Sequence, residues 1–206
     1  MFAIRIHGRG GQGVVTAAEM LSQAAFLEGK FAQAVPSFGS ERTGAPVVAY
    51  CRIADCMLRG REPVARPDAL IIQDPTLRFL PEVFEGMPVG GYLLVNSARP
   101  LAELGIGDRL AGLRRSRVAS LDASRIARSH LGRPLPNTAL LGGFAALSGV
   151  LSLDSIAEAF RQRFDDTVAE ANVRAAFEAY RLVAAQRHGR EQLRGHRVLR
   201  AQTARP

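Results

Sequence analysis

The sequence predicts an α/β protein, with one open and mostly parallel sheet, a glycine loop at its start and a helical C-terminal part. Three observations support this prediction. The chain opens with a strand pattern, a glycine-rich turn and a helix pattern in direct succession. Short apolar runs follow, as in strands buried on both faces of a sheet. The last third instead spaces its apolar residues by three and four, which is the helical period.

The size and composition of the chain indicate one globular domain. Its 206 residues are enough to bury a sizeable core, and 47% of them are hydrophobic while 22% are charged. We expect no membrane span, because no apolar run approaches the ~20 residues that one needs. The first residues contain no basic segment leading into an apolar stretch, so we expect a cytoplasmic protein.

The net charge of +8 raises the question of nucleic-acid binding. Lys30 is the only lysine among 27 basic residues, and such a skew is typical of a coding bias. The arginines are spread along the chain, and no basic patch alternates with aromatic residues, which make up only 6%. We therefore expect no nucleic-acid partner.

The cysteines and histidines do not form a metal or catalytic pattern. Cys51 and Cys56 are two, whereas an iron–sulfur cluster takes four ligands. The four histidines are scattered, and the sequence holds no CxxC, HExxH or GxSxG motif. We predict no catalytic residue and no metal ligand in this chain, so that any metal centre belongs to partners.

The first elements follow in order from the N-terminus. Phe2–His7 alternates apolar residues as a strand does. The glycine-rich turn Gly8–Gly13 comes next, and Val14–Glu28 has the spacing of a helix. Gly29 is placed to end that helix in the left-handed conformation.

A second group of strands follows this helix. Phe31–Val35 is a plausible strand, which Pro36 interrupts. Residues 36–46 contain two prolines, two glycines and two serines, which is the composition of a loop. The next four strands are predicted at Val47–Ile53, Ala69–Gln73, Tyr92–Asn96 and, more weakly, Arg117–Leu121.

The C-terminal third is predicted to be helical. Asp122 caps a short helix ending near Gly132, and Asn137 caps a second that runs to Leu147. Ser152 or Asp154 starts a third. A long helix is predicted over 167–187. We assign 1–187 to the domain and 188–206 to an arginine-rich tail that frays or docks.

The spacing Gly8-x-Gly10-x-x-Gly13 matches the fingerprint of dinucleotide-binding loops. Its glycines permit a tight turn and bring a phosphate close to the N–H groups of a helix N-terminus. A dinucleotide site also needs an acidic residue after the second strand for the ribose, and none lies between Lys30 and Ser40. Dinucleotide binding, another phosphate site, and a loop packed against a partner all remain open.

Two further groups of polar residues have alternative explanations. The segment Ser37–Arg42 brings hydroxyls, a carboxylate and a guanidinium onto a glycine-rich backbone, either as a surface hairpin loop or as an anion or partner contact. Asp74 and Asn96–Ser97 follow predicted strands, where open α/β sheets place ligand contacts. Turn capping explains them equally well.

Four segments in register resemble one family. The chain is similar to the gamma subunit of pyruvate:ferredoxin oxidoreductase and related 2-oxoacid:acceptor oxidoreductases from Met1 to about Tyr180. The segments that carry this resemblance are GRGGQGVVTAAEML (8–21), AQAVPSFGSERTGAPV (32–47), QDPTL (73–77) and GRPLPNTALLG (132–142).

The resemblance implies a role in a complex. These enzymes decarboxylate a 2-oxoacid oxidatively on thiamine diphosphate with Mg²⁺, pass electrons through [4Fe–4S] clusters to ferredoxin or another acceptor, and release an acyl-CoA. It implies that partners of the alpha, beta and delta types hold those cofactors, and that this chain holds none alone but helps to receive CoA. The expected contacts are Gly8, Gly10, Gly11, Gln12, Gly13, Ser37, Gly39, Ser40, Arg42 and Asn137.

One position departs from the family pattern. The family loop usually reads Glu-Arg-Arg-Gly-Ala-Pro, whereas Thr43 stands here in place of the second arginine. This loss of a guanidinium suggests a different, bulkier or aromatic 2-oxoacid. Two other hypotheses stay open: a stand-alone dinucleotide-binding domain of redox or regulatory role, and a structural spacer subunit that does not touch CoA.

Overall fold

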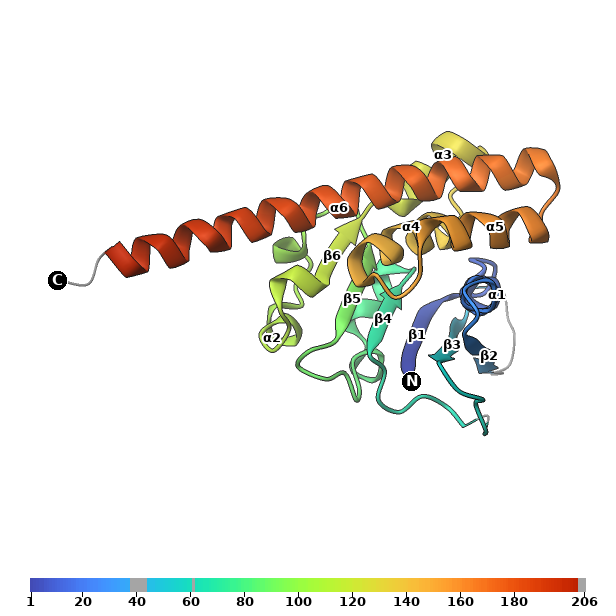
Figure 1. Cartoon of the computed structure of the whole chain (residues 1–206), viewed down its shortest axis with the longest axis horizontal. Helices are drawn as coiled ribbons and strands as arrows, with labels where there is room; N and C mark the ends of the chain where they lie inside the picture. The colour runs from blue at the N-terminus through green and yellow to red at the C-terminus, as the bar shows by residue number, and fades with distance from the viewer. Residues whose placement is uncertain (38–43, 61, 204–206) are drawn as a thin grey trace.

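A computed structural model describes the backbone of residues 1–37, 44–60 and 62–203, and the side chains of those residues except 37 and 189–203. A six-stranded sheet forms the centre of the molecule, and helices cover it (Figure 1). The strands are β1 (Phe2–Arg9), β2 (Phe31–Ser37), β3 (Pro46–Ala54), β4 (Ala69–Ile72), β5 (Tyr92–Asn96) and β6 (Val118–Leu121).

The helices are concentrated in the C-terminal half of the chain. They are α1 (Val14–Leu27), α2 (Gly107–Leu110), α3 (Ala123–Leu131), α4 (Asn137–Ser148), α5 (Leu153–Arg163) and α6 (Asp166–Thr203). Short 3₁₀ turns, which the sequence did not predict, fill the connections at η1 (Pro75–Phe79), η2 (Pro81–Val83), η3 (Leu101–Glu103) and η4 (Arg115–Arg117).

The order of the strands is β2-β3-β1-β4-β5-β6. The strands β1, β4, β5 and β6 pair in parallel, whereas β3 lies antiparallel between β1 and β2. This arrangement confirms the predicted single, mostly parallel sheet with a helical C-terminal part. It also brings the C-terminal ends of β1 and β2 to one edge, on either side of the start of β3.

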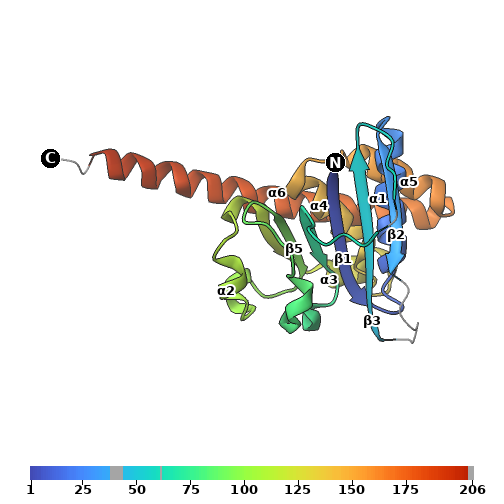
Figure 2. The same ribbon diagram turned by 90° about the horizontal axis from the view of Figure 1, so that it is seen from below.

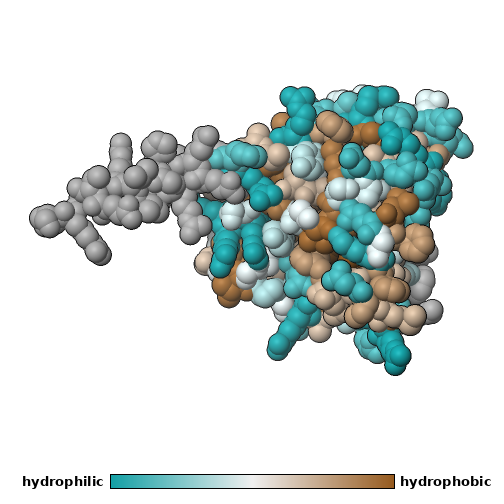
Figure 3. Space-filling view, viewed as in Figure 1, coloured by the Kyte–Doolittle hydropathy of each residue, from teal (hydrophilic) through white to brown (hydrophobic). Residues whose placement is uncertain are grey.

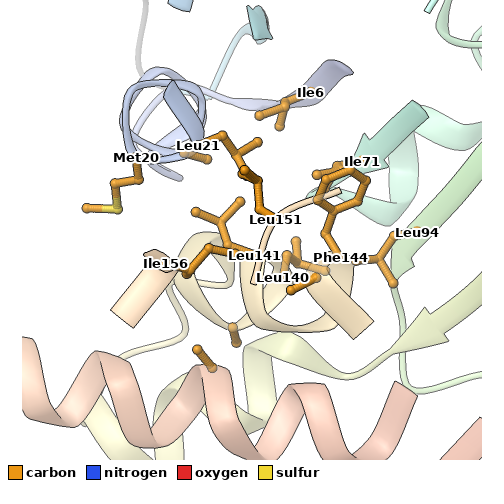
Figure 4. Close-up of a cluster of buried hydrophobic side chains, with 14 of the residues drawn as sticks. Ile6, Met20, Leu21, Ile71, Leu94, Leu140, Leu141, Phe144, Leu151 and Ile156 are labelled. Carbon is orange, nitrogen blue, oxygen red and sulfur yellow. The ribbon is translucent and has the colours of Figure 1, made fainter. Parts of the chain in front are cut away.

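The sheet buries apolar side chains on both faces. In β4, Ala69 and Ile71 join a large cluster with α1 and α4, whereas Leu70 and Ile72 join a smaller cluster on the other face. Figure 4 shows the larger cluster, in which Phe144 and Leu140 of α4 lie between the sheet and α1. This two-sided burial explains why β4 and β5 are continuous apolar runs instead of alternating ones.

Helix α6 forms an outer layer over α4 (Figure 1). The two helices approach closely because Gly142 of α4 has no side chain: a Cβ there would lie 2.1 Å from the carbonyl oxygen of Ala176. Towards its C-terminus, α6 extends away from the body in both views (Figures 1 and 2).

The predicted ends of several elements are confirmed. Gly29 is left-handed with φ of 73°, the Asp122 side chain accepts the N–H of Arg125, and the Ser152 hydroxyl caps α5. The Glu28 carboxylate accepts hydrogen bonds from the N–H of Ser152 and from Ser155, which ties the end of α1 to the start of α5. Burial acts to raise the pKa of Glu28, but its hydrogen bonds from Lys30 and the two serines lower it to about 2.

Two predicted boundaries differ from the structure. Strand β2 continues through Pro36 to Ser37, because β2 is the outer strand of the sheet and an outer strand tolerates a residue without an N–H group. The long helix α6 does not end at Arg187 but continues to Thr203, across the start of the predicted tail. The division into 1–187 and 188–206 therefore remains a prediction that no change of secondary structure marks.

Apolar side chains are exposed beside the outer strand. Phe26 is 70% exposed, Phe31 45% and Met57 70%, and all three line a cavity of ≈ 490 Å³. Elsewhere in the view of Figure 3, polar and apolar side chains are interspersed over the body. Within the described residues, no helix is both long enough and apolar enough to cross a membrane.

Candidate functional site

The glycine loop follows β1 directly and leads into α1. Gly11 and Gly13 have φ values of 90° and 69°, and Gly13 is the N-terminal cap residue of α1. Only glycine adopts this left-handed backbone without strain. Gly8 is required for a different reason, since a Cβ there would lie 2.5 Å from Cγ2 of Val14. The sequence pattern therefore reflects backbone geometry at each of these three positions.

The second glycine-containing loop lies beside the first. The N–H of Gly10 donates to the carbonyl of Ala45 at 2.9 Å, and the N–H of Gly44 donates to the carbonyl of Gly10 at 3.3 Å. At the other end of the same loop, Ser37 closes β2 and pairs with Val48. The described ends of the two loops thus meet at one sheet edge, as their positions after β1 and β2 predict.

Three of the predicted contact residues cannot be placed. Gly39, Ser40 and Arg42 lie outside the described residues, and so does Thr43, the position that departs from the family pattern. Their expected roles stay predictions from the sequence.

Gln12 uses both ends of its side-chain amide within the protein. Its Oε1 accepts the N–H of Arg9 at 2.8 Å, and its Nε2 donates to Oδ2 of Asp74 at 2.9 Å. These bonds hold the turn against the end of β4. Gln12 is therefore arranged to shape the loop.

Asp74 joins the glycine loop to the segment after β4. Its Oδ1 accepts the N–H of Thr76 at 2.9 Å, which caps the turn η1, and its Oδ2 lies 3.3 Å from Nε of Arg9. Burial alone acts to raise the pKa of Asp74, but hydrogen bonds from Thr76 and Gln12 and the charge of Arg9 lower it overall. Asp74 is thus a carboxylate at neutral pH, and its charge is partnered.

Asn137 lies against the glycine loop from the opposite side. The sequence predicted that it caps α4, but the cap residue is Pro136, and Asn137 is the first residue of the helix. Its side chain instead reaches the loop, where Nδ2 lies 3.5 Å from the carbonyl oxygen of Gly13. A Cβ on Gly13 would lie 2.4 Å from this Nδ2, so that glycine at 13 and asparagine at 137 fit only together.

The contact between Gly13 and Asn137 brings two helix N-termini together. Helix α1 begins after Gly13 and α4 begins at Asn137, and neither cap position provides a side-chain acceptor. The first turns, Val14–Ala17 and Asn137–Leu140, are described in full and contain no acidic residue. Unpaired N–H groups and the positive ends of two helix dipoles therefore lie at one place, which is the local chemistry of an anion site.

A buried glutamine lies under the same edge. Gln73 is 1% exposed and directly precedes Asp74, yet among the described atoms neither end of its side-chain amide has a hydrogen-bond partner. Its backbone is fixed, because its N–H donates to the carbonyl of His7 at 2.7 Å and its carbonyl accepts from Asn96 at 2.8 Å. A Cβ on Gly8 would lie 3.2 Å from the Cβ of Gln73, which places this glutamine next to the glycine loop.

His7 is a buried structural residue of β1. Burial, assisted by the nearby charge of Arg5, lowers the pKa of His7 to about 3, so its imidazole is neutral at physiological pH. It is 5% exposed, and Nε2 has no hydrogen-bond partner among the described residues. This placement agrees with the interpretation of His7 as a strand residue.

The sequence located the loop but missed part of its support. Gly8, Gly10, Gly11, Gln12, Gly13 and Asn137 gather at one edge. Arg9 and Thr76 were not predicted to take part. The Asp-Pro-Thr turn after β4 was their only signal, because it aims a carboxylate at the loop.

Two cavities lie away from this edge. One of ≈ 240 Å³ lies between α1 and α5 and is lined by Met20 and Gln162 among others, and the other is the cavity of ≈ 490 Å³ beside Phe31. The glycine loops form an open edge instead of an enclosed pocket. Among the described residues, no group of three or more His, Cys, Asp or Glu side chains could hold a metal ion.

Comparison with known proteins identifies relatives over most of the chain. The sequence profile of the family described as pyruvate ferredoxin/flavodoxin oxidoreductase matches residues 3–182. The common subunit gamma of the pyruvate/ketoisovalerate oxidoreductases of Thermococcus litoralis is 41% identical, over 87% of this chain and 96% of the relative. Pyruvate synthase subunit PorC of Methanothermobacter thermautotrophicus is 43% identical, over 87% of this chain and 94% of the relative.

Solved structures share the fold. Pyruvate oxidoreductase subunit PorC of Thermotoga maritima aligns with a TM-score of 0.74 at 35% identity, over 87% of this chain and 95% of that one. A 2-oxoglutarate:ferredoxin oxidoreductase of Magnetococcus marinus, with 2-oxoglutarate, coenzyme A and succinyl-CoA bound, aligns with a TM-score of 0.70. At 17% identity, and over 89% of this chain and 31% of that one, this second likeness shows the fold alone.

Proposed function

The chain belongs to the pyruvate ferredoxin/flavodoxin oxidoreductase family, and from this premise we propose that it is the gamma subunit of a 2-oxoacid:acceptor oxidoreductase that forms an acyl-CoA. In this proposal the complex decarboxylates a 2-oxoacid oxidatively. Electrons pass through iron–sulfur clusters to ferredoxin or another acceptor, and CoA takes the acyl group. The gamma chain contributes the CoA side of the site.

The meeting of two helix N-termini at Gly13 carries this proposal. CoA is a polyanion, and its pyrophosphate needs N–H donors and positive potential. The starts of α1 and α4 supply both, in first turns that contain no acidic residue among their described positions. The nearby Asp74 carboxylate does not oppose an anion strongly, because Arg9 balances its charge at 3.3 Å.

The second loop adds side chains that suit the same ligand. Ser37 and Ser40 bring hydroxyls, and Arg42 brings a planar guanidinium that can hold a phosphate through two parallel hydrogen bonds. The described ends of this loop reach Gly10, so the loop lies next to the two helix N-termini. Asn137 orients its amide at the boundary between α4 and the glycine loop.

The other cofactors of the proposed complex are assigned to partners. Thiamine diphosphate with Mg²⁺ supplies the decarboxylation chemistry, and [4Fe–4S] clusters supply the electron path. We propose that subunits of the alpha, beta and delta types hold them. The work of this chain is then to bind the phosphates of CoA and to fix its direction, so that the thiol end reaches the reaction centre in a partner.

Reconstitution tests the assignment to a complex. We expect the isolated chain, supplied with thiamine diphosphate, Mg²⁺ and CoA, to oxidise no 2-oxoacid. Adding it to the partner subunits should restore CoA-dependent turnover. Turnover by the isolated chain would refute its role as a subunit that is inactive alone.

Arg42→Ala in the assembled complex tests the CoA contact. A charge-assisted hydrogen bond is worth about 1.5–3 kcal/mol, so the KM for CoA should rise about ten- to a hundredfold. Arg42→Lys should restore only part of the affinity, since lysine lacks the planar fork. Arg128→Ala, in the exposed last turn of α3, is the matched control and should leave this KM unchanged. An unchanged KM in Arg42→Ala with intact assembly would reject the contact, and loss of co-purification would point to a subunit interface.

A further inference from the structure

Asp74 lies where three segments of the site edge meet. Its Oδ1 caps η1 through the N–H of Thr76 at 2.9 Å. Its Oδ2 accepts from Nε2 of Gln12 at 2.9 Å and lies 3.3 Å from Nε of Arg9. Capping the turn needs only the first oxygen. The second oxygen is directed at the glycine loop, which a residue with a purely local role would not require.

Arg9 extends the same connection to the second loop. One terminal nitrogen of its guanidinium donates to the carbonyl of Gly44 at 3.0 Å, and the other donates to Oγ1 of Thr76 at 2.8 Å. With Nε facing Asp74, the planar fork contacts both the second loop and η1. Because a guanidinium is rigid, these contacts fix the separation of the two segments.

Gln12 completes the set inside the first loop. Its Oε1 holds the N–H of Arg9, so the side chain that meets Asp74 also determines the shape of the turn. Asp74, Arg9, Gln12 and Thr76 are here called the loop clamp. The clamp joins the ends of β1 and β4 and the start of β3 through side chains, in addition to the backbone bonds between Gly10 and residues 44–45.

We propose that Asp74 is a positioning residue of the CoA site, which holds the two glycine loops at a fixed spacing through Arg9 and Gln12. This inference rests on the proposed function. Asp74 does not touch CoA in it. Loosening the clamp lets the loop N–H groups turn away from the ligand and leaves the reaction centre in the partner unchanged.

Asp74→Asn in the assembled complex is the primary test. The variant keeps a carbonyl oxygen for Thr76 and nearly the same volume, but it loses the charge facing Arg9 and presents an NH₂ group to Nε2 of Gln12. We expect the KM for CoA to rise about tenfold, equivalent to ~1.4 kcal/mol. The kcat at saturating CoA and the KM for the 2-oxoacid should stay within about twofold, since only CoA binding is affected. A purely structural defect would not split KM from kcat in this way.

A swapped pair separates positioning from general damage. In the double variant Gln12→Glu/Asp74→Asn, the carboxylate moves to position 12, still accepts the N–H of Arg9, and now accepts from the new amide at 74. We expect the KM for CoA to return to within about threefold of the unmodified complex, because complementary partners restore a coupled pair. A double variant as poor as the single one, or worse, would overturn the clamp.

Amide hydrogen exchange gives a second measurement on the same complex without CoA turnover. We expect faster exchange at residues 8–13 and 44–46 in Asp74→Asn, with α5 unchanged. If Asp74→Asn does not assemble, Asp74→Ser takes its place, because serine still caps Thr76 but cannot reach Gln12 or Arg9. It should show the same rise in KM and the same faster exchange, and unchanged values in it would overturn the inference.

The Arg42 variant distinguishes the two possible failures. If Arg42→Ala raises the KM for CoA and the Asp74 variant does not, the loop clamp is wrong and the proposed function stands. If neither variant changes this KM, CoA does not bind at the glycine loops, and both the CoA assignment and the present inference fail.

Discussion

His7 shows how a single buried side chain makes stability depend on pH. Its imidazole is neutral in the folded protein, because burial and the neighbouring Arg5 lower its pKa to about 3. In the unfolded chain its pKa returns to about 6.5. Below about pH 6.5 the unfolded chain therefore binds a proton that the folded protein excludes. The contribution of His7 to stability is complete above that pH and is lost as the pH falls towards 3.

We predict a measurable slope from this residue. Between pH 6.5 and 5 the free energy of unfolding of the chain should fall, by at most about 1.4 kcal/mol per pH unit for one proton. In His7→Gln this part of the slope should vanish, since glutamine does not titrate. Urea unfolding at half-unit pH steps would show the difference. Parallel curves for the two proteins over this range would contradict the burial of a neutral imidazole.

At the residue scale, the sequence predicted what depends on neighbouring residues only. The left-handed Gly29 and the caps Asp122 and Ser152 follow from the local backbone, and all three are confirmed. Asn137 looked like a cap from its position but turns towards Gly13, a residue 124 positions away in the chain. The contacts of Arg9 are equally remote, with Gly44 and Thr76, so no local pattern could announce them.

Two adjacent glycines in α4 provide a test at the scale of elements. A Cβ on Gly142 would lie 2.1 Å from the backbone oxygen of Ala176 in α6, and backbone cannot yield without moving a helix. On Gly143 it would lie 3.1 Å from Cδ2 of Leu121 and 3.3 Å from Cγ2 of Val183, both of which are side-chain atoms. The two positions share one helix and one composition but differ in what opposes them.

We predict opposite outcomes for the two alanine variants. Alanine gains about 1 kcal/mol of helix propensity over glycine at either position. At 142 the overpacking, typically 1–3 kcal/mol, should outweigh this gain, because a contact this short demands separation of α4 and α6. Gly142→Ala should therefore lower the Tm by several degrees, whereas Gly143→Ala should stay within about 1 kcal/mol of the original chain. Calorimetry would decide, and a neutral Gly142→Ala would show that the helices are not in contact there.

The sequence predicted the type and order of the strands better than their limits. Buried runs such as 69–73 and 92–96 are short and apolar, and only the interior of a parallel sheet suits them. The continuation of β2 through Pro36 depends on its place as the outer strand, which is a property of the whole sheet. The position of β3 between β1 and β2 is of the same kind, because strand order depends on contacts across the whole domain.

At the scale of the molecule, α6 divides into a packed part and an extension. Its first turns pack on α4 and α5, and its C-terminal part leaves the body in both views (Figures 1 and 2). The family profile ends at residue 182, close to the point where the predicted tail begins. From Arg187 to Thr203 the helix is about 24 Å long at 1.5 Å per residue.

We predict that the domain folds without this extension. A chain that ends at Arg187 keeps the contact between the Arg187 side chain and the carbonyl of Ala146, and it keeps the buried Val183. Its Tm should lie within about 2 °C of that of the full chain, as for changes away from the core. It should still restore CoA-dependent turnover to the partner subunits. A large loss of Tm would place the extension in the fold, and a loss of turnover alone would place it in assembly.

The outer strand β2 has a consequence for the life of the chain before it assembles. Beside that strand, Phe26, Phe31 and Met57 are exposed, and an uncovered strand edge next to apolar side chains invites further strands to pair with it. A surplus of this subunit over its partners should therefore accumulate in inclusion bodies or be cleared by proteases. We expect cells to make it in step with the rest of the complex, and recombinant yield to rise on co-expression. Supply in proportion is the condition that this edge sets.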